Sequence, residues 1–523
     1  MAALSQVVTA IQTQGPERGL SLNKSKCVLW GPGTAAENLS RYPALQGISV
    51  VPFLPGSGLR VLGVPVEHPA EVGTFTRDLF GKAVARLEKM CSRLTHLPAT
   101  HVQYTLLRYC LDGCRLNFLT RCSSAAHVEA QVHRADAILN QTLGDVLGTP
   151  LGPKQWDQAK LPQRHGGLGI GSPVDLQAPG RLATVVDFIL RARKVLHLQP
   201  DLELVPPDFQ RVVQAMAQTL GPEFDPLKGW VSEPMAVHKA EAVHSQQRWW
   251  GERWHKARAK QLPVGLTARD QVRVSLQQAQ RGAAWLSVNP SAGQGTELNN
   301  DECRLALRFW LGAPLVPSLW QGASCPLCGQ ALDVLGDHMV CCSKNQLKHR
   351  HSVLQGALAE LAQLAGIPVA MEVALPDGSV PGDVCFRQWD ADGPLMVDLT
   401  CRHPTPVGSA PPPVDGLAAW FAAQAEDKDS TYLDKCRRAG YSFLPFVVTP
   451  WGGLGPEAMR VLLRLQKLAL GTKRGWARTR LAQQFWQKLS LAVAKPVARQ
   501  LTAILQVQEP AWGVGPAQHH PYA

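Results

Sequence analysis

Residues 367–401 read IPVAMEVALPDGSVPGDVCFRQWDADGPLMVDLTC and contain three short runs rich in apolar and β-branched residues. The runs cover 367–375, 380–386 and 395–401, and Pro, Gly and Asp residues separate them, a pattern typical of successive strands. Immediately before them, residues 352–365 carry leucine and valine side chains at helical spacing. We therefore expect a helix followed by three strands.

The residues after these strands continue the alternation. A proline-rich loop over 404–413 is followed by a predicted helix over 416–438, a strand over 441–449 and a helix over 456–470. Helices that alternate with strands predict an α/β core, because each helix can cover an apolar sheet face. We expect an α+β protein of several domains, with this α/β core near its carboxyl end.

Three acidic residues follow one another along the predicted strands: Glu372 on the first, Asp383 on the second and Asp398 on the third. Adjacent strands could bring these carboxylates to one edge of the sheet. Oxygen ligands of this kind bind Mg²⁺, and the bound cation can activate water for phosphodiester hydrolysis. The sequence therefore predicts a catalytic site containing all three acids, with Asp383 and Asp398 as magnesium ligands.

A basic residue beside such a site would balance charge or lower the pKa of the attacking water. A nuclease with this arrangement of carboxylates would usually place a lysine two residues beyond Asp398. Thr400 stands at that position, and Lys428 is the candidate substitute. On the following helix Lys428, Tyr432 and Lys435 fall at i, i+4 and i+7, on one face that could overhang the carboxylates. Taken singly, these residues are compatible with turn, edge or solvated positions. Their order on successive elements favours a catalytic site.

A second group of metal-ligating residues precedes the predicted core. The residues with the spacing C-x2-C-x9-H-x3-C are Cys325, Cys328, His338 and Cys342. Three thiolates and one imidazole complete the tetrahedral shell of a structural zinc ion. Cys341 is the alternative to Cys342, which we prefer because a spacing of four residues from His338 suits one face of a helical turn. Asp337 could orient the His338 imidazole. The other interpretation is a set of unrelated buried thiols and a surface histidine.

Composition limits the class of protein. The chain has 523 residues, of which 45% are hydrophobic, enough for several domains with their own cores. Its 53 Lys and Arg residues against 41 Asp and Glu residues give a net charge of +12, which favours polyanionic partners. We find no membrane-spanning run and no signal peptide. The 13 scattered cysteines favour reduced thiols plus one metal site. We expect a soluble nuclear or cytoplasmic protein.

The rest of the chain is predicted to be mostly helical. Three short strands are expected first, over 27–30, 48–53 and 59–66. Apolar residues then recur at helical spacing through most of 74–147. The basic segment 248–260 contains Trp249, Trp250 and Trp254, which could stack on unpaired bases. At helical spacing these rings are also compatible with a buried core stripe, the interpretation that we favour.

Several short motifs occur together in the second half of the chain. They are CPLCG at 325–329, GDHMVCC at 336–342, PGD at 381–383, VD at 397–398, K-x3-Y at 428–432 and FLPFVVTPWGGLG at 443–455. Together with Glu372 they resemble the carboxyl-terminal zinc knuckle and restriction-like endonuclease of non-LTR retrotransposons. Nearer the amino terminus, GLSLNKSKCVLW at 19–30, VLGVPV at 61–66 and WDQAKLPQRHGGLGI at 156–170 resemble the end of the palm and the thumb of their reverse transcriptases.

The resemblance implies six segments. They are a remnant of the end of a reverse transcriptase palm at 1–68, a helical thumb and connection region at 69–245, a helical linker at 246–320, a zinc knuckle at 321–345, a restriction-like endonuclease domain at 346–475, and a C-terminal helix and tail at 476–523. The sequence has no Tyr-x-Asp-Asp string, so we expect no reverse transcription. The resemblance implies a Mg²⁺-dependent endonuclease that nicks DNA, with RNA as a second ligand. The alternative is a non-enzymatic nucleic-acid-binding remnant.

Overall fold

The computed structural model describes residues 1–31, 37, 39–61, 63–196, 208–221, 224, 247–279, 281–316, 322–390 and 393–511. Parts of the predicted thumb region (197–207, 222–223 and 225–245), the first residue of the linker (246), the junction between linker and knuckle (317–321) and part of the tail (512–523) lie outside the described residues. By their contacts the residues form two compact units. The first contains Met1–Cys91, Leu111–Leu139 and Ser172–Trp254, and the second contains Ser92–Cys110, Asn140–Gly171 and His255–Ala523.

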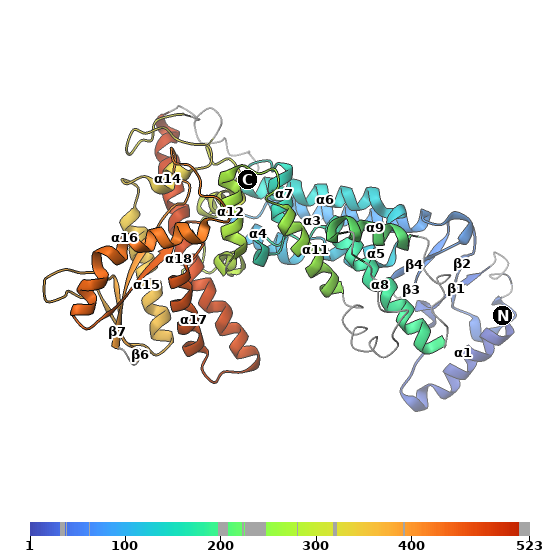
Figure 1. The fold of residues 1–523 in the computed structure, drawn as a ribbon. Helices are drawn as coiled ribbons and strands as arrows, with labels where there is room; N and C mark the ends of the chain where they lie inside the picture. Colours follow the sequence, from blue (N-terminus) through green and yellow to red (C-terminus); the bar gives the residue numbers. More distant parts are fainter. Residues whose placement is uncertain are drawn as a thin grey trace. The chain divides into compact units, whose positions relative to one another are not determined.

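The first unit combines small two-stranded sheets with helices (Figure 1). Its elements are α1 (Ala2–Gln14), β1 (Val28–Gly31), β2 (Ser49–Pro52), β3 (Gly58–Val61), β4 (Val64–Glu67), α5 (Cys114–Cys122), α8 (Pro173–Leu196) and α9 (Phe209–Leu220), with the first parts of α3 (Thr74–Thr95), α6 (Ala125–Leu147) and α11 (Gln247–Gln261). β1 and β2 pair in parallel, and β3 and β4 form an antiparallel hairpin. The strand predicted over 59–66 is therefore two strands. Gly63, with φ 89°, lies between them.

The indoles of the basic segment belong to a hydrophobic core in this unit. Trp250 and Trp254 are 2% and 8% exposed and pack with α8 and α9. The Trp254 indole N–H donates to Asp175 Oδ1 at 3.4 Å. Trp249 packs partly buried against the same core, with the Arg253 guanidinium 4.0 Å from its ring. The core interpretation of these three rings is confirmed.

The second unit contains the predicted α/β core. Its elements are α4 (Thr100–Leu106), α7 (Pro153–Lys160), α12 (Ala268–Ala279), α13 (Asn300–Leu311), α14 (Asp337–Cys341), α15 (Leu347–Leu364), β5 (Val369–Met371), β6 (Val384–Asp390), β7 (Gly393–Cys401), α16 (Leu417–Arg438), β8 (Ser442–Val448), α17 (Pro456–Leu470) and α18 (Gly475–Ala511). The strands form one sheet in the order β5-β6-β7-β8. β8 is parallel to β7, and the other pairs are antiparallel. The predicted succession of helix, three strands, helix, strand and helix is confirmed.

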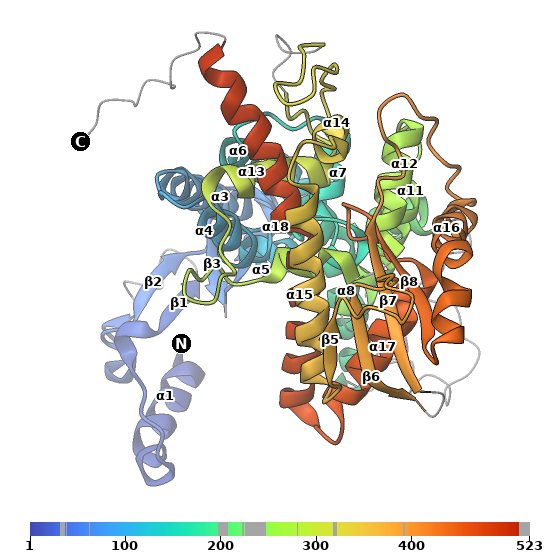
Figure 2. The same ribbon diagram turned by 90° about the vertical axis from the view of Figure 1, so that its left-hand side faces the viewer.

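Helices cover both faces of this sheet. Alternate residues of β7, including Leu395 and Val397, pack in the core cluster that contains α15, α17 and α18. Met396 points to the opposite face and packs with Cys436 of α16. α15 and α16 accordingly lie on opposite sides of the sheet (Figure 2). Because side chains alternate along a strand, Asp398 shares the α16 face with Met396.

The described part of the chain is thus a mixed α and β protein with small sheets. None of the described helices combines the length and the apolar character needed to cross a membrane.

Candidate metal centre and carboxylate site

A tight turn presents the first two cysteines of the knuckle. The Cys325 N–H donates to the Gln330 carbonyl at 2.6 Å, and the Gly329 N–H donates to the Cys325 carbonyl at 2.8 Å. Gly329 has φ 77°, a left-handed conformation that glycine adopts at little cost. Cys325 and Cys328 therefore lie on one compact loop.

The short helix α14 positions the other two ligands. The Asp333 carboxylate accepts hydrogen bonds from the backbone N–H groups of Leu335, Asp337 and His338, at 2.9, 3.0 and 2.7 Å. The bonds to Asp337 and His338 satisfy N–H groups that a helix start leaves without intrahelical partners. Cys342 follows four residues after His338, and its N–H donates to the His338 carbonyl at 2.8 Å. Both side chains therefore leave one face of the turn.

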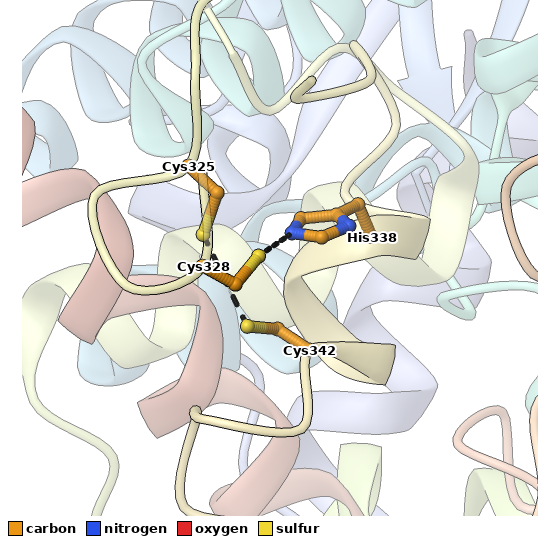
Figure 3. Close-up of side chains that lie close together, drawn as sticks. All are labelled: Cys325, Cys328, His338 and Cys342. Carbon is orange, nitrogen blue, oxygen red and sulfur yellow. Dashed lines mark hydrogen bonds between the residues drawn. The ribbon is translucent and has the colours of Figure 1, made fainter. Parts of the chain in front are cut away.

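The four ligand atoms of the knuckle converge (Figure 3). The sulfur atoms of Cys325, Cys328 and Cys342 and a ring nitrogen of His338 all lie within 4.8 Å of one another. Cys325 Sγ is 4.0 Å from Cys342 Sγ, and Cys328 Sγ is 3.3 Å from His338 Nε2. Tetrahedral zinc would separate such atoms by roughly 3.5–3.8 Å. The group could therefore hold a metal ion such as zinc, and Cys341 is not a member of it.

Asp337 has a different role from the one expected. Its carboxylate accepts hydrogen bonds from Arg269 Nε and Nη2 at 2.8 and 2.6 Å, and His403 Nε2 lies 3.2 Å from Oδ1. Burial acts to raise the pKa of Asp337, but Arg269 and His403 outweigh it and lower this pKa to about 2. Asp337 ties α14 to α12 and to the loop after β7. The prediction that it orients the His338 ring is wrong.

These contacts make the knuckle part of the core of the unit. Trp451 is 1% exposed, and the Arg269 guanidinium and the His403 ring lie 5.0 and 4.7 Å from its ring. Cys325 and Cys342 pack in the same hydrophobic cluster as Trp451. Sequence reasoning missed Arg269 and His403 because each is more than sixty residues from Asp337, the residue that both contact.

The carboxylate site lies where β6 begins beside β7. Asp383 immediately precedes β6, and Asp398 lies within β7. Asp383 Oδ2 accepts the Leu399 N–H at 2.6 Å, and Asp383 Oδ1 is 2.9 Å from Nε2 of His351 on α15. Asp398 Oδ2 is 3.0 Å from Nζ of Lys428 on α16, the helix on the opposite side of the sheet from α15 (Figure 2). The structure thus brings both aspartates, Lys428 and His351 to the place where β6 begins beside β7.

The charges of these four groups act on one another. Burial raises the pKa of Asp398, Lys428 opposes this rise, and the nearby Asp383 carboxylate adds to it. The hydrogen bond to Asp383 raises the pKa of His351 and outweighs the effect of its burial. Two carboxylates therefore share a partly buried site with two groups that can be cationic.

Glu372 does not join this cluster. β5 ends at Met371, and Glu372 is exposed, with φ 47° in the left-handed region. Its backbone N–H donates to the Asp383 carbonyl at 3.1 Å. Among the described residues, the only group of three or more metal-ligating side chains close enough to share an ion is Cys3His. The expected convergence of three acids on one ion is therefore not found.

Tyr432 lies beneath Lys428 rather than among the acids. Its ring centroid is 5.9 Å from Lys428 Nζ and 5.9 Å from the Phe443 ring, and the ring packs in the cluster on the α16 face. Lys428 and Tyr432 do share one face of α16, as their i, i+4 spacing predicts. In this arrangement the Lys428 ammonium packs against the Tyr432 ring.

Sequence reasoning gave no role in the site to two residues of α15. His351 binds Asp383 Oδ1, and Gln355, one turn later, donates to the Asp383 carbonyl at 2.9 Å. The helix was expected to begin at residue 352, whereas α15 begins at Leu347. The signal available was the i, i+4 spacing of His351 and Gln355, which places these two polar side chains on one face of the helix.

Neither a protein-family model nor a curated protein sequence matches this chain. What it does is therefore inferred from the chemistry of its two side-chain clusters.

Proposed function

We propose that this chain is a metal-dependent DNA endonuclease, with Asp383 and Asp398 as its metal-ligating carboxylates. The observation that carries the proposal is the side-chain cluster where β6 begins beside β7. There Asp398 Oδ2 is 3.0 Å from Lys428 Nζ, and the Leu399 N–H holds the Asp383 carboxylate beside it. Paired carboxylates next to a cation are typical of sites that hydrolyse phosphodiesters with a hard divalent metal.

Two aspartates would suffice for Mg²⁺ without a third acid, because Mg²⁺ keeps several waters and uses one or two protein carboxylates. Bound there, Mg²⁺ would lower the pKa of a water molecule and neutralise charge on the phosphodiester. His351 and the Leu399 N–H each hold one Asp383 oxygen, so this carboxylate is oriented in advance. Lys428 favours the ionised form of Asp398 against the effect of burial on its pKa.

The Cys3His group is proposed to hold one structural zinc ion. Four protein ligands would leave no open position for water, and closed sites of this kind stabilise a fold. The zinc would fix the Cys325 loop against α14, which Arg269 and Asp337 join to α12.

The proposed origin is the carboxyl-terminal part of a non-LTR retrotransposon polyprotein. The motifs at 325–342, 381–383 and 443–455 support it by resemblance, as does the net charge of +12. In this proposal the protein lies in the nucleus or the cytoplasm and binds DNA, with RNA as a second ligand. The six segments expected from the sequence remain predictions.

Plasmid nicking tests the proposal. Supercoiled plasmid is incubated with Mg²⁺ and wild-type protein, Asp383→Ala or Asp398→Ala, and the nicked product is quantified. We expect each substitution to slow nicking about 100-fold or more, because a lost metal ligand removes several kcal/mol of transition-state stabilisation. Asp434→Asn, an exposed acid on α16, is the matched control and should nick as the wild type does. Equal nicking by all four proteins would contradict the assignment.

The second candidate is a non-enzymatic nucleic-acid-binding protein. One observation favours it: in the chain alone, Lys428 already neutralises Asp398, and both Asp383 oxygens already have protein partners. Binding of DNA that weakens steeply with salt, without nicking by the wild-type protein, would select this candidate.

A further inference from the structure

Positive charge is concentrated in one stretch of the second unit. Residues 458–508 contain ten Lys and Arg residues and no Asp or Glu, in a chain whose net charge is +12. The stretch covers nearly all of α17 and α18. Cations without interspersed carboxylates are typical of a surface that meets a polyanion.

Four of these cations gather where α17 ends and α18 begins. They are Lys473, Arg474, Arg478 and Arg480, all exposed. Within the described part of the chain, none of the four is paired with a carboxylate. Farther along α18, in contrast, Lys488 pairs with Glu360 and Arg499 pairs with Glu302. The junction therefore presents charge that the second unit itself does not neutralise.

An exposed indole stands among these cations. Trp476 is 74% exposed, the highest value of any large hydrophobic side chain among the described residues. The Arg480 guanidinium lies 5.1 Å from the centre of its ring. An exposed indole beside an arginine offers a flat face on which an unpaired base can stack.

A cavity of about 670 Å³ adjoins the same turn of α18. The charged and amide side chains that line it are Gln163, Arg164, Gln278, Arg281, Arg478 and Gln483. No Asp or Glu is among its described lining residues. Trp486 forms part of the wall, with the Arg281 guanidinium 5.3 Å from its ring. Three arginines and three amides provide donors for phosphate oxygens and for base edges.

We infer that the junction of α17 and α18, together with this cavity, binds single-stranded nucleic acid. Arginine and lysine side chains of the junction contact the phosphates, Trp476 stacks on a base, and the cavity accepts a neighbouring nucleotide. A single strand fits better than a duplex because bases in a duplex are stacked on one another and cannot cover the indole. The cavity volume is in the range that encloses ligands of nucleotide size.

This inference does not depend on the proposed cleavage. The binding surface shares no residue with the carboxylate site, and the experiment uses no divalent cation. Asp398→Ala should bind single strands with wild-type affinity, so loss of nicking and loss of strand binding are distinguishable.

Fluorescence anisotropy tests the inference with full-length protein and a labelled 20-nucleotide oligothymidine, its oligouridine counterpart and a 20-base-pair duplex. We expect the single strands to bind at least about 10-fold more tightly than the duplex. Trp476→Ala should weaken single-strand binding about 10-fold, in line with the loss of one stacked base. Arg474→Gln with Arg478→Gln should lower the slope of log K against log salt by roughly 1.4, about 0.7 for each phosphate contact.

Arg460→Gln is the matched control. It removes one charge from the same stretch, but Arg460 is already paired with Glu457 on α17. Its affinity should stay within about twofold of the wild type. The inference is overturned if the duplex binds as tightly as the single strands, if Trp476→Ala binds like the wild type, or if Arg460→Gln weakens binding as much as the double variant. Tight binding of either oligothymidine or oligouridine supports it, and the ratio of the two Kd values shows whether DNA or RNA is preferred.

Discussion

The knuckle and the carboxylate site lie in the same compact unit but satisfy their ligand atoms differently. In the knuckle, three sulfurs and one ring nitrogen turn toward one another within 4.8 Å. In the carboxylate site, His351, Lys428 and the Leu399 N–H already occupy carboxylate oxygens of Asp383 and Asp398. The first arrangement could hold a metal ion such as zinc, whereas the second is also stable as an ion-pair cluster. The two sites therefore differ in how strongly geometry alone argues for a metal.

The two sites also differ in how they depend on the rest of the fold. The knuckle ligands span only eighteen residues, on one loop and one helical turn. The carboxylate site draws on α15, β7, α16 and the residue before β6. Loss of zinc should therefore weaken folding at the knuckle. Loss of a divalent cation from the carboxylate site should leave folding unchanged.

The largest expected effect is at the knuckle. Cys325→Ser with Cys328→Ser removes two ligands, and zinc content should fall from about one equivalent to near zero. The unit should also unfold at a lower temperature, because structural zinc contributes roughly 10 kcal/mol or more of binding free energy. Elemental analysis and a thermal melt measure both.

Cys341→Ser is the control for this pair, because Cys341 is outside the ligand group. It should keep one equivalent of zinc. If the variant with both Cys325→Ser and Cys328→Ser retained one equivalent of zinc, the knuckle would not be the zinc site, and its geometry would no longer argue for a metal more strongly than that of the carboxylate site.

A second, smaller effect concerns the ion pair that anchors the knuckle. Asp337→Ala leaves the Arg269 guanidinium buried, with Asp270 as its remaining carboxylate partner. We expect a loss of about 3 kcal/mol in the free energy of unfolding, measured with urea. Asp427→Ala is the comparison, because its pair with Arg402 is exposed and 3.9 Å long. It should cost less than about 1 kcal/mol, and equal losses in the two variants would refute the anchoring role.

A third, smaller effect concerns His101, whose protonation lowers the stability of the second unit at acid pH and so limits the pH range in which the two sites can be compared. Burial lowers the pKa of His101 to about 4, while its Nδ1 accepts the Leu298 N–H at 3.4 Å. Between pH 6.5 and 4 the unfolded chain binds a proton that the folded chain does not, so stability falls as the pH falls through this window. At pH 5 the loss should be roughly 2 kcal/mol relative to pH 7.5. The variant His101→Asn should show a loss smaller by this amount, and an equal loss would refute the assignment.

The order of helices and strands in the second unit could be predicted from periodicity, and the Cys3His group from spacing. Both signals are local in the sequence. The conformation of Glu372 could not be predicted, because β5 ends at Met371 and the next residue turns into the left-handed region. The partnership of Asp337 with Arg269 depends on tertiary packing between α12 and α14, which spacing does not encode.

The most direct test of a metal at the carboxylate site is a Mn²⁺ titration, in which the paramagnetic resonance signal of the free ion is followed at constant zinc content. We predict that the wild-type protein binds one Mn²⁺ per chain and that Asp383→Asn and Asp398→Asn bind it at least about 10-fold more weakly. Glu372→Gln should bind Mn²⁺ as the wild type does, because this side chain is exposed and outside the cluster. Absence of Mn²⁺ binding by the wild-type protein, or equal binding by Asp398→Asn, would contradict the account.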